Sequence, residues 1–181
     1  MRKRMTTLLI VAAVLVSVGV GTTVALLVAA SNPVVNTFTV GGVDITLHET
    51  TGSEYTMTPG VTVEKDPTVT VRANSEHSWL FVKVEKSRGF DTFCTCEMEA
   101  GWTALAGQAG VYYRTVGKST SDQHFPVLKD NAIHISSSLT EEQLNAVTEN
   151  PTLSITAYAA QSDGIATAAD AWQVLNEGEE A

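Results

Sequence analysis

The sequence of 181 residues predicts a mainly all-β protein of the sandwich or barrel class, with a few short helices. Apolar and polar residues alternate in many short segments, which is typical of strands with one buried face. Turn-forming residues separate these segments at the close spacing found in sandwiches and barrels. Helical spacing of apolar residues is confined to two stretches after residue 138. The length fits a single domain.

Residues 1–30 have the features of an export signal. Three basic residues at positions 2–4 precede an apolar run over Leu8–Ala30, which ends in small residues. This is the order of regions in a signal peptide, so we expect cleavage between Ala30 and Ser31. The apolar run is also long enough to span a bilayer, so a retained membrane anchor remains the alternative.

The charge of the chain limits its partners. The whole chain has 11 basic and 20 acidic residues and a net charge of −9. Removing residues 1–30 takes away three basic and no acidic residues, so the predicted mature domain, 31–181, has 8 basic against 20 acidic residues and a formal charge of −12. Such a domain is a poor partner for nucleic acid or anionic lipid. We therefore expect membrane contact only through the signal segment before cleavage.

The first predicted strand of the mature chain is Asn36–Leu47. Its apolar residues share one face, and a pair of glycines within it allows a bulge or bend. A strand with one apolar face has to join a sheet, either in its own molecule or in a neighbouring one. The residues expected to make this pairing are Phe38, Val40, Gly41, Gly42, Val43, Ile45 and Leu47.

Further strands and two helices are predicted behind this segment. Trp79–Glu85 is the clearest strand, because it is rich in aromatic and β-branched residues. A capping box at Thr140 and Gln143 starts a helix that we expect to run about three turns, to Asn150. The other strands are predicted at Val61–Glu64, Thr68–Arg72, Val111–Val116, Phe125–Leu128, Ile133–Ile135 and Leu153–Ala159, and a C-terminal helix carries Ala168, Trp172 and Leu175 on one stripe.

Both cysteines lie in Phe93–Glu99, where strict alternation places Cys94, Cys96 and Met98 on one face. The simplest interpretation is that the cysteines are small hydrophobic residues of the core. A disulfide, within the chain or between chains, stays open because exported proteins meet an oxidising environment. A metal site is the third alternative, although the segment shows no further ligands.

Several segments together resemble the TasA/camelysin family, and the resemblance runs over nearly the whole chain. It rests on an export signal followed directly by Asn36–Gly41, then Lys65–Pro67 with Val69 and Val71, the Trp79–Val84 strand, Val111–Tyr113, Ile155–Gln161 and Ala171-Trp172. Proteins of this family belong to the cell surface and biofilm matrix of Gram-positive bacteria, and a signal peptidase of the SipW type processes them. The resemblance therefore implies secretion and a jelly-roll β-sandwich with helices inserted between strands.

The resemblance also implies a function. In TasA-like proteins the N-terminal strand, freed by cleavage, can complete the sheet of the next subunit and build fibres, a role that would fall here on Ser31–Leu47. We expect a structural protein that associates with itself or with other matrix proteins, that is not an enzyme, and that needs no metal or cofactor.

Two other functions compete with this expectation. Camelysin is described as a surface metalloprotease, but this sequence has no H-E-x-x-H motif among its four histidines, His48, His77, His124 and His134. An exported ligand-binding module would use Trp79, Trp102 or Tyr112 as a stacking platform, although aromatic residues in a sandwich of this size more often lie in the core.

Overall fold

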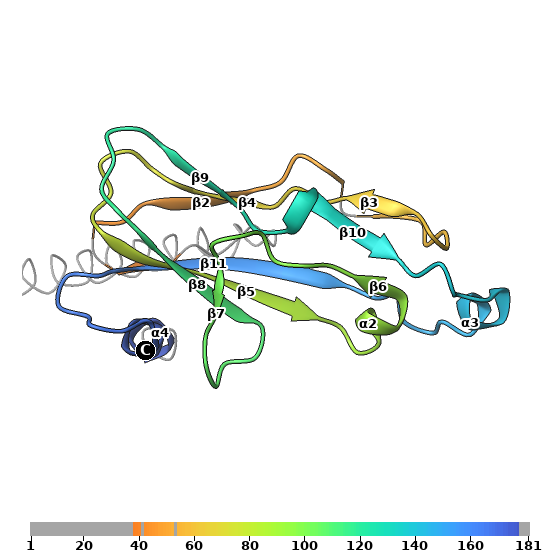
Figure 1. Cartoon of the computed structure of the whole chain (residues 1–181). Helices are drawn as coiled ribbons and strands as arrows, with labels where there is room; N and C mark the ends of the chain where they lie inside the picture. Colours follow the sequence, from red (N-terminus) through yellow and green to blue (C-terminus); the bar gives the residue numbers. More distant parts are fainter. Residues whose placement is uncertain (1–37, 41, 53, 178–181) are drawn as a thin grey trace, which may run out of the picture. The chain divides into compact units, whose positions relative to one another are not determined.

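Two layers of β-sheet pack face to face in a computed structural model that describes residues 38–40, 42–52 and 54–177 (Figure 1). The chain divides into two compact units, and every described residue belongs to the second, Val35–Ala181. Within it, strands clearly outnumber helices. The predicted all-β sandwich with short helices is confirmed.

The first layer is a five-stranded sheet. Its order is β1 (Phe38–Val40), β11 (Leu153–Gln161), β5 (Ser78–Lys86), β8 (Val111–Val116) and β7 (Thr103–Ala104). β5 and β11 pair antiparallel along their full length of nine residues and form the centre of the sheet. β1 is parallel to β11, whereas the other neighbours in this sheet are antiparallel.

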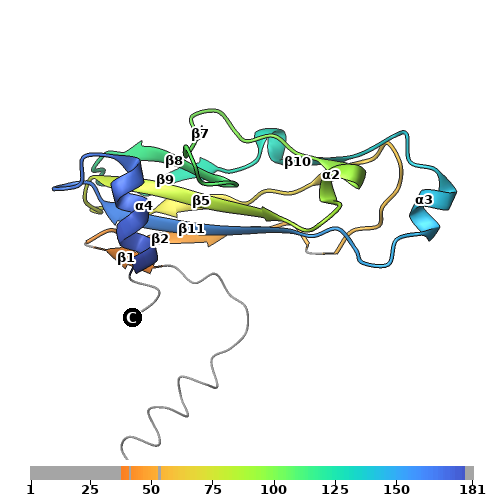
Figure 2. The same ribbon diagram turned by 90° about the horizontal axis from the view of Figure 1, so that it is seen from below.

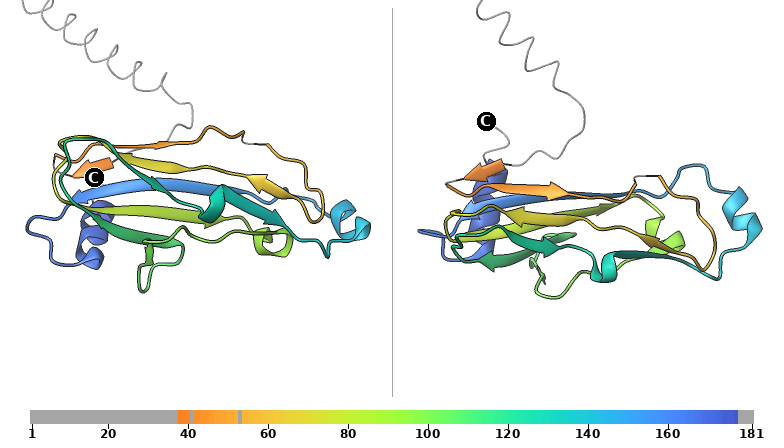
Figure 3. Two further views of the ribbon diagram at one scale, coloured as in Figure 1. Left: turned by 45° about the horizontal axis from the view of Figure 1, so that its top comes forward. Right: turned by 90° about the horizontal axis from the view of Figure 1, so that it is seen from above.

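The second layer consists of two three-stranded antiparallel sheets that lie end to end (Figure 3). One contains β2 (Ile45–His48), β4 (Thr68–Val71) and β9 (Gln123–Pro126), and the other contains β3 (Thr62–Glu64), β10 (Ala132–Ile135) and β6 (Cys94–Thr95). β3 leads into β4, and β9 leads into β10. These two stretches of chain therefore supply two of the three strands of each sheet. The first break falls at Pro67, which has no N–H to donate, and the second holds the 3₁₀ turn η1 (Lys129–Asn131).

The five-stranded sheet packs against the second layer on one face and is covered in part by a helix on the other. Leu80 and Val82 of β5 face the second layer, whereas Phe81 between them faces helix α4 (Ala168–Glu177), which packs across the outer face (Figure 2). The rings of Phe81 and Trp172 lie 5.3 Å apart between centroids. The predicted stripe of the C-terminal helix is confirmed, because Ala168, Trp172 and Leu175 are all buried.

Two short helices lie at strand ends. Helix α2 (Phe90–Phe93) precedes β6, and helix α3 (Glu141–Asn145) begins with the predicted capping box between Thr140 and Gln143. The predicted length of about three turns is wrong, because α3 has five residues. None of its residues is buried, so no tertiary packing supports a longer helix here.

The predicted strand Asn36–Leu47 is two strands in two different sheets. β1 pairs with β11 in the five-stranded sheet, whereas β2 pairs with β4 in the opposite layer. The chain therefore crosses between the layers in the stretch between Val40 and Ile45 instead of continuing through a bulge. Behind the crossing the expected alternation holds, since Val43 and Ile45 are buried and Asp44 is exposed.

The segment around the cysteines is also less regular than predicted. Phe93 ends helix α2, and only Cys94–Thr95 forms a strand, followed by an isolated bridge between Met98 and Leu128. Regular pairing stops because the facing segment turns at Asp130 and Asn131, whose φ angles of 54° and 51° are incompatible with a strand.

Candidate functional site

Strand β1 carries the part of the predicted strand-pairing segment that lies in the five-stranded sheet. Phe38, Thr39 and Val40 are opposite Tyr158, Ala159 and Ala160. Residues 1–37, which include the predicted cleavage point between Ala30 and Ser31, lie outside the described residues, as do Gly41 and the side chains of Phe38 and Val40. Val43, Ile45 and Leu47 belong to the β2 region and pack in or against the core between the layers.

One edge of β11 is covered only in part. β5 pairs with all nine residues of β11 on one side, whereas β1 pairs with three residues on the other. In the described part of the chain, no strand pairs with the outer edge of Leu153–Ala157. The same is true of the edge of β3 that faces away from β10. Both edges therefore offer main-chain groups for pairing.

A groove with a volume of about 860 Å³ touches both of these strands. Val63 of β3 and Leu153 of β11 line it at the two edges. Its floor is formed by side chains of the core between the layers, namely Phe90, Cys94, Ile133 and Ile135. The groove thus reaches the apolar interior of the sandwich from the side.

One further wall of the groove is the segment Asn150–Thr152 before β11, and another is the segment that connects β2 to β3. Glu54, Tyr55, Thr56 and Met57 line the groove from this segment. We call residues 49–57 the strap. The strap has no helix or strand, and none of its described residues is buried.

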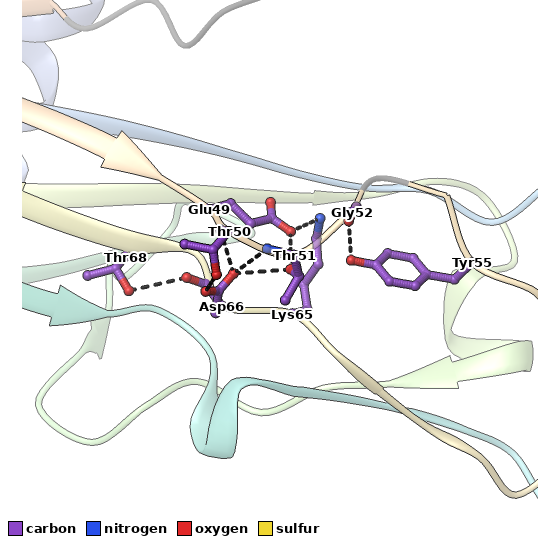
Figure 4. Close-up of polar contacts among 8 residues, drawn as sticks. All are labelled: Glu49, Thr50, Thr51, Gly52, Tyr55, Lys65, Asp66 and Thr68. Atoms are coloured by element: carbon purple, nitrogen blue, oxygen red, sulfur yellow. Dashed lines mark hydrogen bonds and ion pairs between the residues drawn. The ribbon is translucent and has the colours of Figure 1, made fainter.

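The strap is fastened at its start by the carboxylate of Asp66 (Figure 4). This carboxylate accepts hydrogen bonds from the backbone N–H of Thr50 at 2.9 Å and of Thr51 at 3.0 Å. It also accepts from both threonine hydroxyls, that of Thr51 at 3.1 Å. The Thr50 hydroxyl and the other donors hold the pKa of Asp66 well below its usual range.

Four further contacts hold the strap (Figure 4). Glu49 forms an ion pair with Lys65 and accepts a hydrogen bond from the Thr51 hydroxyl at 2.8 Å. The Tyr55 hydroxyl donates to the carbonyl of Gly52, and the Lys65 ammonium lies 5.6 Å from the centroid of the Tyr55 ring. Of the strap contacts drawn in Figure 4, all but that of Tyr55 lie at the start of the strap.

The cysteines differ in their exposure. Cys94 is buried and lines the groove, whereas Cys96 is half-buried, and both are thiols in the structure. Burial raises the pKa of both thiols, so both are neutral at pH 7 and weakly nucleophilic. Among the residues that the structure describes, no group of three or more His, Cys, Asp or Glu side chains could hold a metal ion.

The four histidines lie in four separate places. His48 ends β2 and His77 precedes β5, while the other two lie on strands of the second layer. The ring Nδ1 of His124 bonds to the hydroxyl of Thr70, and that of His134 bonds to the hydroxyl of Thr62, each at 2.9 Å. His134 lies on the surface of its sheet, exposed between two buried isoleucines.

The three aromatic residues considered as a stacking platform do not share one surface. Trp79 packs on the side of helix α4 and donates its Nε1–H to the carbonyl of Ile165 at 3.1 Å. Trp102 and Tyr112 pack against the core between the layers. The Trp102 Nε1–H donates to the carbonyl of Pro126 at 2.8 Å.

Sequence reasoning missed the groove, the strap and the role of Asp66. The Lys65–Pro67 segment is visible in the sequence as an interruption between strands, but only the fold brings Asp66 next to residues 15 and 16 positions earlier. The consecutive threonines, 50 and 51, are the one available signal, because threonines hydrogen-bond readily to nearby polar groups.

Comparisons with known proteins gave no match to a family model, to a curated protein or to a solved structure. In the described residues, every helix is too short or too polar to cross a bilayer.

Proposed function

We propose that the chain is a secreted structural protein of the cell surface or biofilm matrix of a Gram-positive bacterium, which assembles into fibres when each copy donates its N-terminal strand to the next. The resemblance to the TasA/camelysin family supports this proposal at the level of the sequence. The observation that carries it is the short pairing of β1 on an edge of β11 that is otherwise open.

The pairing of β1 within its own molecule is small enough to be exchanged. It joins three residues of β1 to β11, and each backbone hydrogen bond contributes about 0.5–1.5 kcal/mol net. A β1 strand that leaves its own sheet therefore loses only a few kcal/mol of backbone hydrogen bonding. Pairing with another copy regains these bonds and can add more along a longer edge.

The exchanged part of the chain ends near Gly42. Val43 and Ile45 are each 2% exposed, and burial of such side chains is worth roughly 1.5–3 kcal/mol each. β2 therefore stays with β4, and the segment Ser31–Gly42 reaches out from it. The receiving surface in this proposal is the open edge of β11 beside the groove.

Deletion of Ser31–Gly42 from the mature protein tests the proposed function. Light scattering and electron microscopy should show fibres for the intact mature chain and monomers for the truncated chain. A synthetic peptide of Ser31–Leu47, added to the truncated chain, should bind to it and occupy the open edge. Fibres from the truncated chain that match those from the intact chain would rule out strand donation.

A further inference from the structure

The strap occupies the place where an added strand would enter the groove. Its residues Glu54–Met57 line the same cavity as Val63 of β3 and Leu153 of β11, which belong to the two strands with open edges. An extended segment that paired with either edge in this region would meet the strap. The strap is therefore a cover over the apolar floor of the groove.

The contacts of the strap suit a cover that can move. Its start is held by Asp66 and by the ion pair between Glu49 and Lys65. Beyond Gly52 it holds no buried residue, and Tyr55 is 41% exposed. Displacing the strap as a whole exposes little apolar surface of the strap itself, so the cost of opening lies mainly in the contacts at its start and in those of Tyr55.

The chemistry of the groove fits one particular occupant. The floor is apolar, whereas Glu54 and Lys65 line the groove away from this floor, so against the floor a segment without charges is preferred over a charged one. The N-terminal stretch Ser31–Gly42 has no charged residue, although the mature chain is rich in acidic residues. A second copy of this chain therefore carries a segment that suits the groove in charge and polarity.

We infer that the strap closes the groove against the N-terminal segment of a second copy, and that the contacts of Asp66 set how often the groove opens. This inference rests on the proposed function. It adds that assembly requires the strap to move, so a variant with a looser strap start assembles faster than the natural chain.

The substitution Asp66→Asn in the full mature chain tests this inference. It keeps the size of the side chain but replaces charge-assisted hydrogen bonds by weaker neutral ones. The lag before fibre growth, followed by light scattering, should shorten by roughly three- to tenfold, which is the loss expected for weakening one or two such bonds. A lag equal to that of the natural chain, or longer, would overturn the inference.

Asp122→Asn is the matched control. Asp122 is exposed whereas Asp66 is half-buried, but the Asp122 carboxylate likewise accepts hydrogen bonds, from the backbone N–H of Ala73 at 2.8 Å and from Arg72 at 2.9 Å. It does not line the groove. Its variant should keep the natural lag, and an equal shortening in both variants would show a general effect of charge and contradict gating by the strap.

A second variant covers the case in which Asp66→Asn fails to fold. Thr51→Val removes a hydroxyl whose one proton is shared between Glu49 and Asp66, while it keeps the shape of the side chain and the backbone N–H that donates to Asp66. It should shorten the lag in the same direction by a smaller factor. Circular dichroism and thermal unfolding of each variant establish that the fold is intact before the lags are compared.

Hydrogen exchange of the strap amides distinguishes failure of this inference from failure of the proposed function. If exchange in the strap becomes faster in Asp66→Asn but the lag does not change, strap opening does not limit assembly and the inference is wrong, while strand donation stands. If the chain without Ser31–Gly42 still forms fibres, the proposed function is wrong. Faster exchange together with a shorter lag, both lost on deletion of Ser31–Gly42, is the result that the inference predicts.

Discussion

Two single residues, Asp66 and Gly110, hold connecting segments against the strands of this sandwich. The carboxylate of Asp66 joins the strap to the junction of β3 and β4. The absence of a side chain at Gly110 allows its segment to approach β5, where its carbonyl accepts a hydrogen bond from the N–H of Val84 at 2.8 Å. The effects of pH on the Asp66 contacts and of substitution at Gly110 can each be predicted and measured against a control.

The first prediction concerns the effect of low pH on the hydrogen bonds of Asp66. The hydrogen bonds to Asp66 lower its pKa below the ordinary value of 3.8, so they stabilise the fold fully above that value. This contribution is lost as the pH falls through the lower pKa of the folded state. The amide signals of Thr50 and Thr51 in NMR spectra should therefore stay constant from pH 7 to about pH 4 and shift only in stronger acid. A titration centred near pH 4 would contradict the hydrogen bonding described here.

The second prediction compares two glycines with left-handed backbones. Gly110 has a φ of 75°, and a Cβ there would collide with the carbonyl oxygen of Val84. Gly107 has a φ of 78° with open space around it. Gly107→Ala should lower the free energy of unfolding by about 1–2 kcal/mol, and Gly110→Ala should lower it by clearly more. Urea unfolding measures both, and equal losses would mean that the close approach is absent.

The third prediction distinguishes the two cysteines. Cys94→Ser places a hydroxyl at a buried position and should cost about 1–3 kcal/mol of stability. Cys96→Ser should cost less, because Cys96 is only half-buried. Neither variant should change fibre formation. A disulfide between chains would instead be established if fibres of the natural chain dissolve in reducing agent and the double variant, Cys94→Ser with Cys96→Ser, forms none.

At the scale of elements, helix α4 shows how the sheet is protected on its outer face. Trp172 contacts Phe81 and lies edge-on to Tyr158, with ring centroids 5.2 Å apart. Trp172→Ala should therefore cost about 3–5 kcal/mol. Val174, on the same helix, is 38% exposed, so Val174→Ala should change stability by less than about 0.5 kcal/mol. Thermal unfolding that is equally affected by both would argue against the packing of α4 on the sheet.

The same elements show what the sequence can predict. The strand at Trp79 and the stripe of α4 were predictable, because alternation and helical spacing report which side is buried. The break between β1 and β2 was not, because a pair of glycines allows both a bulge within one strand and a crossing between sheets. The length of α3 depends on packing that the sequence does not display. The groove and its strap arise from contacts between distant segments, which periodicity cannot detect.

At the scale of the whole molecule, the account depends on one edge of β11. β1 covers three residues of this edge, and the open remainder lies beside a groove that reaches the core. An edge of this kind favours pairing with another chain unless it is covered. The described residues of the strap line the groove and pair with neither edge.

Amide hydrogen exchange of Leu153–Ala157, measured in the monomer and in the assembled form, tests strand addition at this edge most directly. The amides that bond to β5 should be protected in both forms, and those that point away from β5 should exchange quickly in the monomer. On assembly the outward amides should become protected, because the donated strand of a second copy accepts their hydrogen bonds. Outward amides that exchange equally fast in monomer and fibre would contradict strand donation at β11.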